Sequence, residues 1–208
     1  MMATGKERLT RNWLRLLVVI MALVALPILG ITAYLVHIRA TAAALIESAS
    51  NIRSTEDAQR QIAAWRKREG KQFWQESDHP GGQHSYDGQI ENLLVSRLHI
   101  LEPTVVTVGL TMQNGKLQNL AVIIQSVRYP TAAVWVQEWF DSGPANRFHV
   151  SKHYQPLTAV VEFSASVPDI QRDKVFALNT KCFVQPRGCG SAEDILPGIW
   201  QLDPVTDR

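Results

Sequence analysis

The chain has 208 residues, 46% of them hydrophobic and 19% charged, and its 21 Lys and Arg against 19 Asp and Glu leave a formal charge of +2. So high an apolar content excludes a disordered chain, and so small a charge excludes a polycationic nucleic-acid binder, so no nucleic-acid partner is expected. The length allows one or two domains.

The charges are unevenly distributed, because residues 16–36 contain none. The tail before this segment has four basic residues and one acidic one, a charge of +3: Lys6, Arg8, Arg11, Arg15 and Glu7. Subtracting these from the totals leaves 17 basic and 18 acidic residues, a charge of −1, in the part after residue 36. The two ends of the chain therefore differ in electrostatic character.

Residues 16–38 predict a transmembrane signal-anchor helix, since about 20 apolar residues in a helix span a bilayer core of roughly 30 Å. Pro27 and Gly30 fit this interpretation, because membrane helices tolerate both residue types. The basic tail, residues 1–15, precedes the segment, so the positive-inside rule places the N-terminus in the cytoplasm. We expect a single-pass protein of the bacterial inner membrane that contacts the lipid bilayer through residues 16–38 and carries a periplasmic C-terminal domain.

A cleavable signal peptide is the main alternative for this segment. The start is basic, and Ala40-Thr41-Ala42 resembles a cleavage site, so the remainder would then be a secreted domain. Against this, the apolar stretch exceeds the roughly 7–15 residues of a signal h-region. A buried core helix is less compatible with so long a charge-free segment.

After the membrane, residues 39–53 are rich in Ala and Ser and are expected to continue the helix or form a stalk. A helix is then predicted from Ser54, where a capping-box pattern precedes Ala58, Ile62 and Trp65 at positions i, i+4 and i+7. This helix opens the exported domain, residues 54–208.

The rest of this domain predicts strands. Residues 76–89 are polar and rich in Gly, which indicates a loop. Strands are expected at 104–112 and 117–127 around an Asn114-Gly115 hairpin turn, and then at 132–140, 147–154, 157–163 and 174–184. The fold class is therefore α+β, with an N-terminal transmembrane helix and an exported domain in which one main helix packs on an antiparallel sheet of five or six strands.

Cys182 and Cys189 are the two cysteines of the chain. In an oxidising exported compartment, two nearby cysteines that flank a turn predict a structural disulfide bond. The C-x-x-C spacing that redox catalysis requires is absent. Residues 191–197 predict one capped helical turn that ends at a proline.

The sequence gives little support for an enzymatic function, because it contains no familiar hydrolase, nucleotide-binding or metalloprotease motif. His79, His84 and Asp87 in the 78–87 loop are the candidates for an envelope hydrolase. His149 and His153 share a strand face, but the rise per residue separates them by roughly 13 Å, too far for one Zn²⁺. We therefore predict no catalytic residue, no metal site and no cofactor.

Trp135, Gln137 and Trp139 lie on one face of the most aromatic strand. They are either the lining of a groove for an apolar ligand or a partner protein, or a core face that packs against the helix of Ile62 and Trp65. As a candidate site, these three residues are assigned to ligand binding.

The overall layout resembles that of the bitopic subunits of bacterial secretion and envelope-assembly machines that carry NTF2-like domains. A basic tail, one membrane span, a short helical stalk and a helix-plus-sheet exported domain carry this resemblance across the whole chain. The expected function is thus that of a membrane-anchored periplasmic domain that binds a protein partner or a small apolar ligand, within an envelope or secretion assembly.

Overall fold

The structure is a computed structural model that describes residues 5–67, 74–126, 132–140, 149–153, 158–185 and 187–202. The chain divides into two compact units, Met1–His37 and Ile38–Arg208. Helix α1, Gly5–Ser50, runs through the first unit and ends in the second.

The first unit is the apolar part of α1. The region Trp13–Ser50 contains a window with a mean hydropathy of 2.8, long and apolar enough to cross a membrane, and that window is not buried inside the protein. Its large side chains, such as Leu17, Leu23 and Leu29, are exposed. The segment is compatible with a transmembrane helix or a signal anchor, as the sequence predicts.

The last turns of α1 belong to the second unit. Their buried apolar residues recur at the spacing of one helix face: Ile38, Ala42, Leu45, Ile46 and Ala49. Residues 39–53, expected as a helical continuation or a stalk, thus continue the helix to Ser50 and contribute side chains to the core of the domain.

Helix α2, Thr55–Lys67, begins where the capping box predicts. The Ser54 hydroxyl accepts a hydrogen bond from the Asp57 amide at 3.2 Å, and the Asp57 carboxylate accepts one from the Arg53 amide at 3.1 Å. Ala58, Ile62 and Trp65 are its buried residues, which confirms the predicted apolar face.

Seven strands form one mixed sheet in the described part of the chain, in the order β1-β2-β3-β4-β5-β7-β6. Their bounds are β1 Trp74–His79, β2 Gln83–Glu91, β3 Thr104–Gln113, β4 Lys116–Ser126, β5 Ala133–Trp139, β6 His149–His153 and β7 Thr158–Ser164. Each neighbouring pair is antiparallel except β5 and β7, which are parallel. The α+β class is confirmed, but the sheet is mixed rather than wholly antiparallel and has more strands than the five or six expected.

The β3–β4 hairpin follows the sequence closely. Asn114 and Gly115 both have positive φ, at 50° and 75°, as a type I′ turn requires. Glycine reaches this region without a steric cost, and asparagine tolerates it.

Two predicted segments are wrong. Residues 76–89 form the β1–β2 hairpin rather than a loop, with Gly81 and Gly82 at positive φ in the turn. The strand expected at 174–184 is instead the end of α4, Asp169–Phe176, followed by η1, Lys181–Val184. Residues 74–89 contain none of the β-branched residues that favour a strand, and the pairing of β2 with β3 stabilises the strand conformation instead.

The remaining short helices are α3 Leu93–Arg97, α5 Ala192–Ile195 and η2 Ile199–Gln201. The Ser191 side chain caps α5 by accepting a hydrogen bond from the Asp194 amide, as predicted. A disulfide bond joins Cys182 to Cys189, which confirms the predicted pair.

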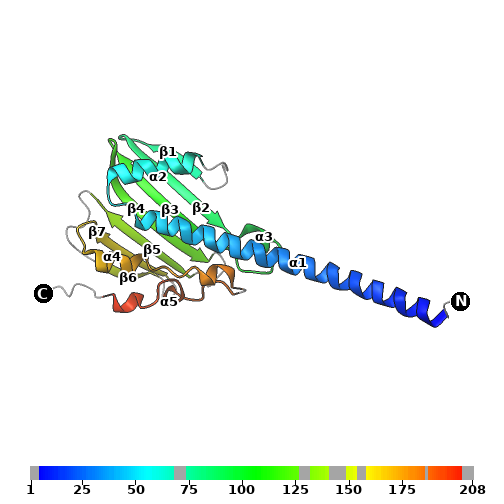
Figure 1. The fold of residues 1–208 in the computed structure, drawn as a ribbon. Helices are drawn as coiled ribbons and strands as arrows, with labels where there is room; N and C mark the ends of the chain where they lie inside the picture. The colour runs from blue at the N-terminus through cyan, green and yellow to red at the C-terminus, as the bar shows by residue number, and fades with distance from the viewer. Residues whose placement is uncertain are drawn as a thin grey trace. The chain divides into compact units, whose positions relative to one another are not determined.

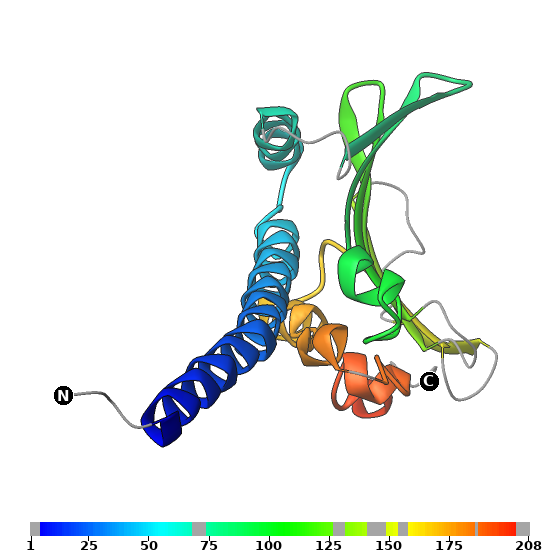
Figure 2. The same cartoon turned by 90° about the vertical axis from the view of Figure 1, so that its right-hand side faces the viewer.

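The sheet has two different faces. The inner face, which includes Val134, Val136 and Glu138 of β5, is buried, and Figure 2 shows α2, α4 and the end of α1 on one side of the sheet. The outer face is formed by the alternate residues, including Trp135, Gln137 and Trp139 of β5. The last turns of α1, from Ile38 to Ser50, run along the strands in Figure 1, with α4 beside their end.

Candidate functional site

The candidate site is the centre of the outer face. Trp135 is 44% exposed, although it lies on a central strand between β4 and β7. The register places Ile123 of β4 and Val160 of β7 directly beside it, and Thr107 of β3 beside Ile123. Three neighbouring strands therefore present an apolar row that is only partly covered.

Polar side chains border this row. In the next register row, Gln137 lies between Ala121 of β4 and Glu162 of β7. Gln137 and Glu162 are both half-buried. A tryptophan beside an amide and a carboxylate can bind a partner group that is both apolar and a hydrogen-bond donor.

Asp87 of β2 extends the polar row beyond Ala121. Its neighbour in the register is Gly109, and a Cβ atom there would lie 2.8 Å from the Asp87 Oδ1 atom. The glycine thus leaves room for this carboxyl to lie across β3. Burial raises the pKa of Asp87, while the charge of His79 acts in the opposite direction.

Trp139 occupies the following row, opposite Asn119 of β4 and Ser164 of β7. Its indole Nε1 is buried and has no hydrogen-bond partner among the described residues. A buried donor without an acceptor costs about 1–3 kcal/mol.

The structure separates the Trp135 face from helix α2. Arg66 of α2 binds Glu76 at 2.8 Å and lies over the Tyr86 ring at 5.6 Å. By strand alternation, Glu76 and Tyr86 are on the inner face, with Leu110 and Leu120. Packing of the Trp135 face against the Ile62/Trp65 helix, the alternative interpretation from the sequence, is therefore wrong.

The inner face contains an ion pair that sequence analysis missed. Arg172 of α4 binds Glu138 of β5 through two hydrogen bonds of 2.7 Å, and each side chain is 1% exposed. Arg172 also donates to the carbonyl oxygens of Ser50 and Ile52, at and just beyond the C-terminus of α1. This one guanidinium links α1, α4 and the sheet, and its cation suits the negative end of a helix.

The three proposed hydrolase residues do not lie together on one face of the β1–β2 hairpin. His84 pairs with Asp78 at 2.5 Å on the inner face, whereas alternation places His79 and Asp87 on the outer face. His79 has a long contact of 3.4 Å with Ser77. Because the three candidates lie on opposite sides of the β1–β2 hairpin, they do not form a shared catalytic site.

The other histidine pair lies on the edge strand. Register places His149 opposite Glu162 and His153 opposite Thr158, while their side chains lie outside the described residues. Among described side chains, no group of three His, Cys, Asp or Glu is arranged to hold a metal ion.

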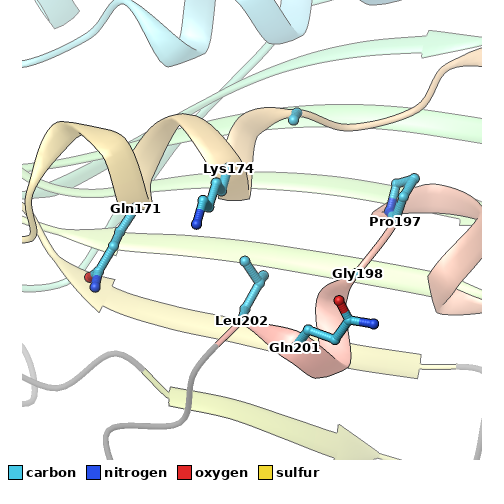
Figure 3. Close-up of a pocket in the computed structure, with 7 residues that line it drawn as sticks. Gln171, Lys174, Pro197, Gly198, Gln201 and Leu202 are labelled. Carbon is cyan, nitrogen blue, oxygen red and sulfur yellow. The ribbon is translucent and has the colours of Figure 1, made fainter.

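A separate hollow of about 420 Å³ lies between α4 and the C-terminal segment. Figure 3 shows Gln171 and Lys174 on α4 and Leu202 pointing towards them from the other side. Among the described residues that line it, Lys174 alone is titratable, so they provide no converging set of polar groups for catalysis or specific binding.

Comparison with family models, characterised proteins and solved structures gave no match for this chain. The functional argument therefore depends on the geometry of the site.

Proposed function

We propose that this protein is a single-pass protein of the bacterial inner membrane whose periplasmic domain binds a protein partner through the outer face of its sheet. The observation that carries the proposal is the 44% exposed Trp135 in the middle of the apolar row with Ile123 and Val160. Tryptophan is among the residues most enriched at the energetic centre of protein interfaces.

The membrane part of the proposal is supported by the apolar region of α1 and by the basic tail that precedes it. The Cys182–Cys189 disulfide bond fits an exported domain, because such bonds persist in oxidising compartments. Anchoring confines the domain to the membrane surface and so raises its effective concentration near other envelope proteins.

A protein partner fits the outer face better than a small apolar ligand. Small-ligand sites are concave and enclose most of the ligand, whereas these residues lie in rows across neighbouring strands. Asp87 and Glu162 both lie in the row beside the apolar row, so a partner with Lys or Arg on one side of an apolar centre is complementary in charge.

The proposal is tested by photocrosslinking in intact cells, with a crosslinking amino acid placed at position 135 of the full chain. Ile170 provides the matched control position, because it is a 70% exposed apolar residue on α4, on the helix side of the sheet. We expect one discrete protein adduct from position 135 and none of that mass from position 170.

The substitution Glu162→Gln examines the charge preference in the same experiment. It should reduce the yield of the position-135 adduct and make that yield less sensitive to salt. Equal adducts from positions 135 and 170, or no protein adduct from positions 135, 123 and 160, would contradict the proposed surface.

The anchor is tested independently by mass spectrometry of the protein isolated from membranes. A mature protein that retains residues 16–38 supports the anchor. A mature N-terminus beyond about Thr41, recovered in the soluble fraction, would instead identify a cleaved signal peptide and a secreted domain.

A further inference from the structure

A second exposed apolar surface is formed by residues 93–100, which we call the tip. Four large aliphatic side chains in this short stretch are exposed by 37–57%: Leu93, Leu94, Leu98 and Ile100. A contiguous apolar surface of this kind marks a site of contact with protein or membrane.

The tip is held firmly by a buried asparagine. Asn92, which is fully buried, accepts a hydrogen bond from the Thr104 amide at 3.0 Å and donates to the carbonyl oxygens of Glu102 and Phe183 at 2.8 and 3.1 Å. These bonds tie the start of α3 to β3 and to the disulfide-linked segment.

The other end of α3 is also fixed. The Ile100 amide donates to the Val95 carbonyl and the His99 amide to the Ser96 carbonyl, each at 3.0 Å, which is the bonding pattern of a Schellman motif. His99 takes the left-handed position with a φ of 56°, where glycine is the usual residue. The exposed leucines therefore belong to a defined structure with its helix end closed.

The tip lies at the end of the sheet where α1 joins the domain. Arg172 joins Ser50 and Ile52, at the end of α1, to Glu138 near the far end of β5. Ile38, the first buried residue of α1, precedes Ser50 by about 18 Å of helix. By strand register, α3 follows β2 at the end of the sheet opposite Glu138, and Figure 1 shows the last turns of α1 lying lengthwise between the two ends.

The charges of the tip suit an anionic surface. Arg97 and His99 are exposed among the leucines, while the nearest acidic residues, Glu91 and Glu102, are half-buried to either side. Segments that lie in the headgroup region of a bilayer combine aliphatic side chains with basic ones.

We propose that the tip, residues 93–100, contacts the interfacial region of the same lipid bilayer that α1 crosses, an inference that rests on the proposed membrane anchor. Ile38, the first residue of the second unit, directly follows the apolar segment along the chain, so a bilayer crossed by that segment would end within a few residues of Ile38. The tip then restricts rotation of the domain on its anchor and orients the outer face.

The test uses the full chain in vesicles of phosphatidylcholine and phosphatidylglycerol, with an environment-sensitive fluorophore on one introduced cysteine. Both native cysteines are in the disulfide bond, so the label reacts with the new thiol. The substitutions are Leu94→Cys in the tip, Ile28→Cys in the apolar segment, and Ile170→Cys as the exposed apolar control.

We expect nitroxide-labelled lipids to quench the labels at positions 28 and 94, with a blue-shifted emission at both, and aqueous iodide to quench the label at position 170. Adding Leu98→Glu and Ile100→Glu should return the position-94 label to iodide access. Quenching at position 28 by lipid, with position 94 accessible to iodide or shielded from both quenchers, would overturn the tip contact alone. Loss of lipid quenching at position 28 would overturn the anchor itself.

Discussion

On the inner face of β5, Glu138 is 1% exposed, whereas on the outer face of the same strand Trp135 is 44% exposed. A glutamate is stable inside because Arg172 neutralises it and satisfies both of its carboxylate oxygens. No comparable cover exists for Trp135 in the described part of the chain. The comparison teaches that burial in this sheet follows the available partners rather than the hydrophobicity of each residue.

The largest expected effect on stability comes from removing the buried ion pair on the inner face. Arg172→Met leaves Glu138 buried without its counterion and removes the donors for Ser50 and Ile52, so we expect a loss of about 3–5 kcal/mol in unfolding free energy. Chemical denaturation of the full chain in detergent, followed by circular dichroism, measures it.

Arg53→Met is the matched control, because Arg53 also joins the end of α1 to α4 but forms exposed ion pairs with Asp169 and Asp173. Such surface pairs contribute about 0–1 kcal/mol. Equal effects of the two substitutions would show that the buried ion pair has no special role.

A smaller loss is expected from Asn92→Ala. The substitution leaves the Thr104 amide and the Phe183 carbonyl without their buried partner, and should lower the unfolding free energy by about 2–3 kcal/mol. Asn119→Ala is the comparison variant, since among the described residues the Asn119 side chain donates one hydrogen bond, of 3.3 Å, to the Glu138 carbonyl. An Asn92 variant as stable as the Asn119 variant in thermal unfolding would contradict the anchoring role of Asn92.

Trp135→Ala examines the outer face and should have a modest effect on stability. A half-exposed side chain gives up little burial, so we expect a change of about 1 kcal/mol. Binding should respond far more, with loss of the protein adduct formed from position 123 or 160. A large drop in the melting temperature would assign Trp135 to the core instead.

The smallest effect concerns pH and Asp87. Because burial raises the pKa of Asp87, its folded form releases a proton at higher pH than its unfolded form. The wild type therefore loses relative stability as pH rises from about 3.8 through the folded pKa, and the loss is constant above it. Asp87→Asn should gain stability over the wild type across that window, measured by thermal unfolding at successive pH values.

Asp57 should change the pH dependence of stability in the opposite direction to Asp87. The hydrogen bond from Ser54 lowers the pKa of Asp57, so its contribution is present above about 3.8 and is lost as pH falls through the folded pKa. Asp57→Asn should be less stable than the wild type near neutral pH and should match it in acid. The same sign for both variants would contradict these assignments.

Local sequence was informative wherever the preference of a segment agreed with its tertiary setting. The capping box at Ser54 predicted the start of α2, and Asn114-Gly115 predicted the β3–β4 turn, because hydrogen bonds and φ angles there depend on a few adjacent residues. Both cysteines were paired correctly for the same reason, since they lie seven residues apart.

Sequence reasoning failed where distant segments supply the stabilising contacts. Strands β1 and β2 are polar and were interpreted as a loop, yet β2 pairs along its length with β3. Arg172 is one of several charged residues in α4, and its partner Glu138 is 34 residues away, so local sequence does not single it out. The candidate site shows the same limit, because Trp135 and Gln137 were identified by alternation, whereas Ile123, Val160 and Glu162 join them only through strand register.

The sequence by itself determined the apolar span, the charge difference across it, the α+β class and the disulfide pair, since composition, periodicity and short-range spacing define each of these. The tertiary structure decided which face of β5 the helices cover, that the end of α1 joins the core, and that Leu94 and its neighbours stay exposed. These features depend on contacts between residues far apart in the chain. Such contacts contribute to stability only after the sheet and the helices have come together.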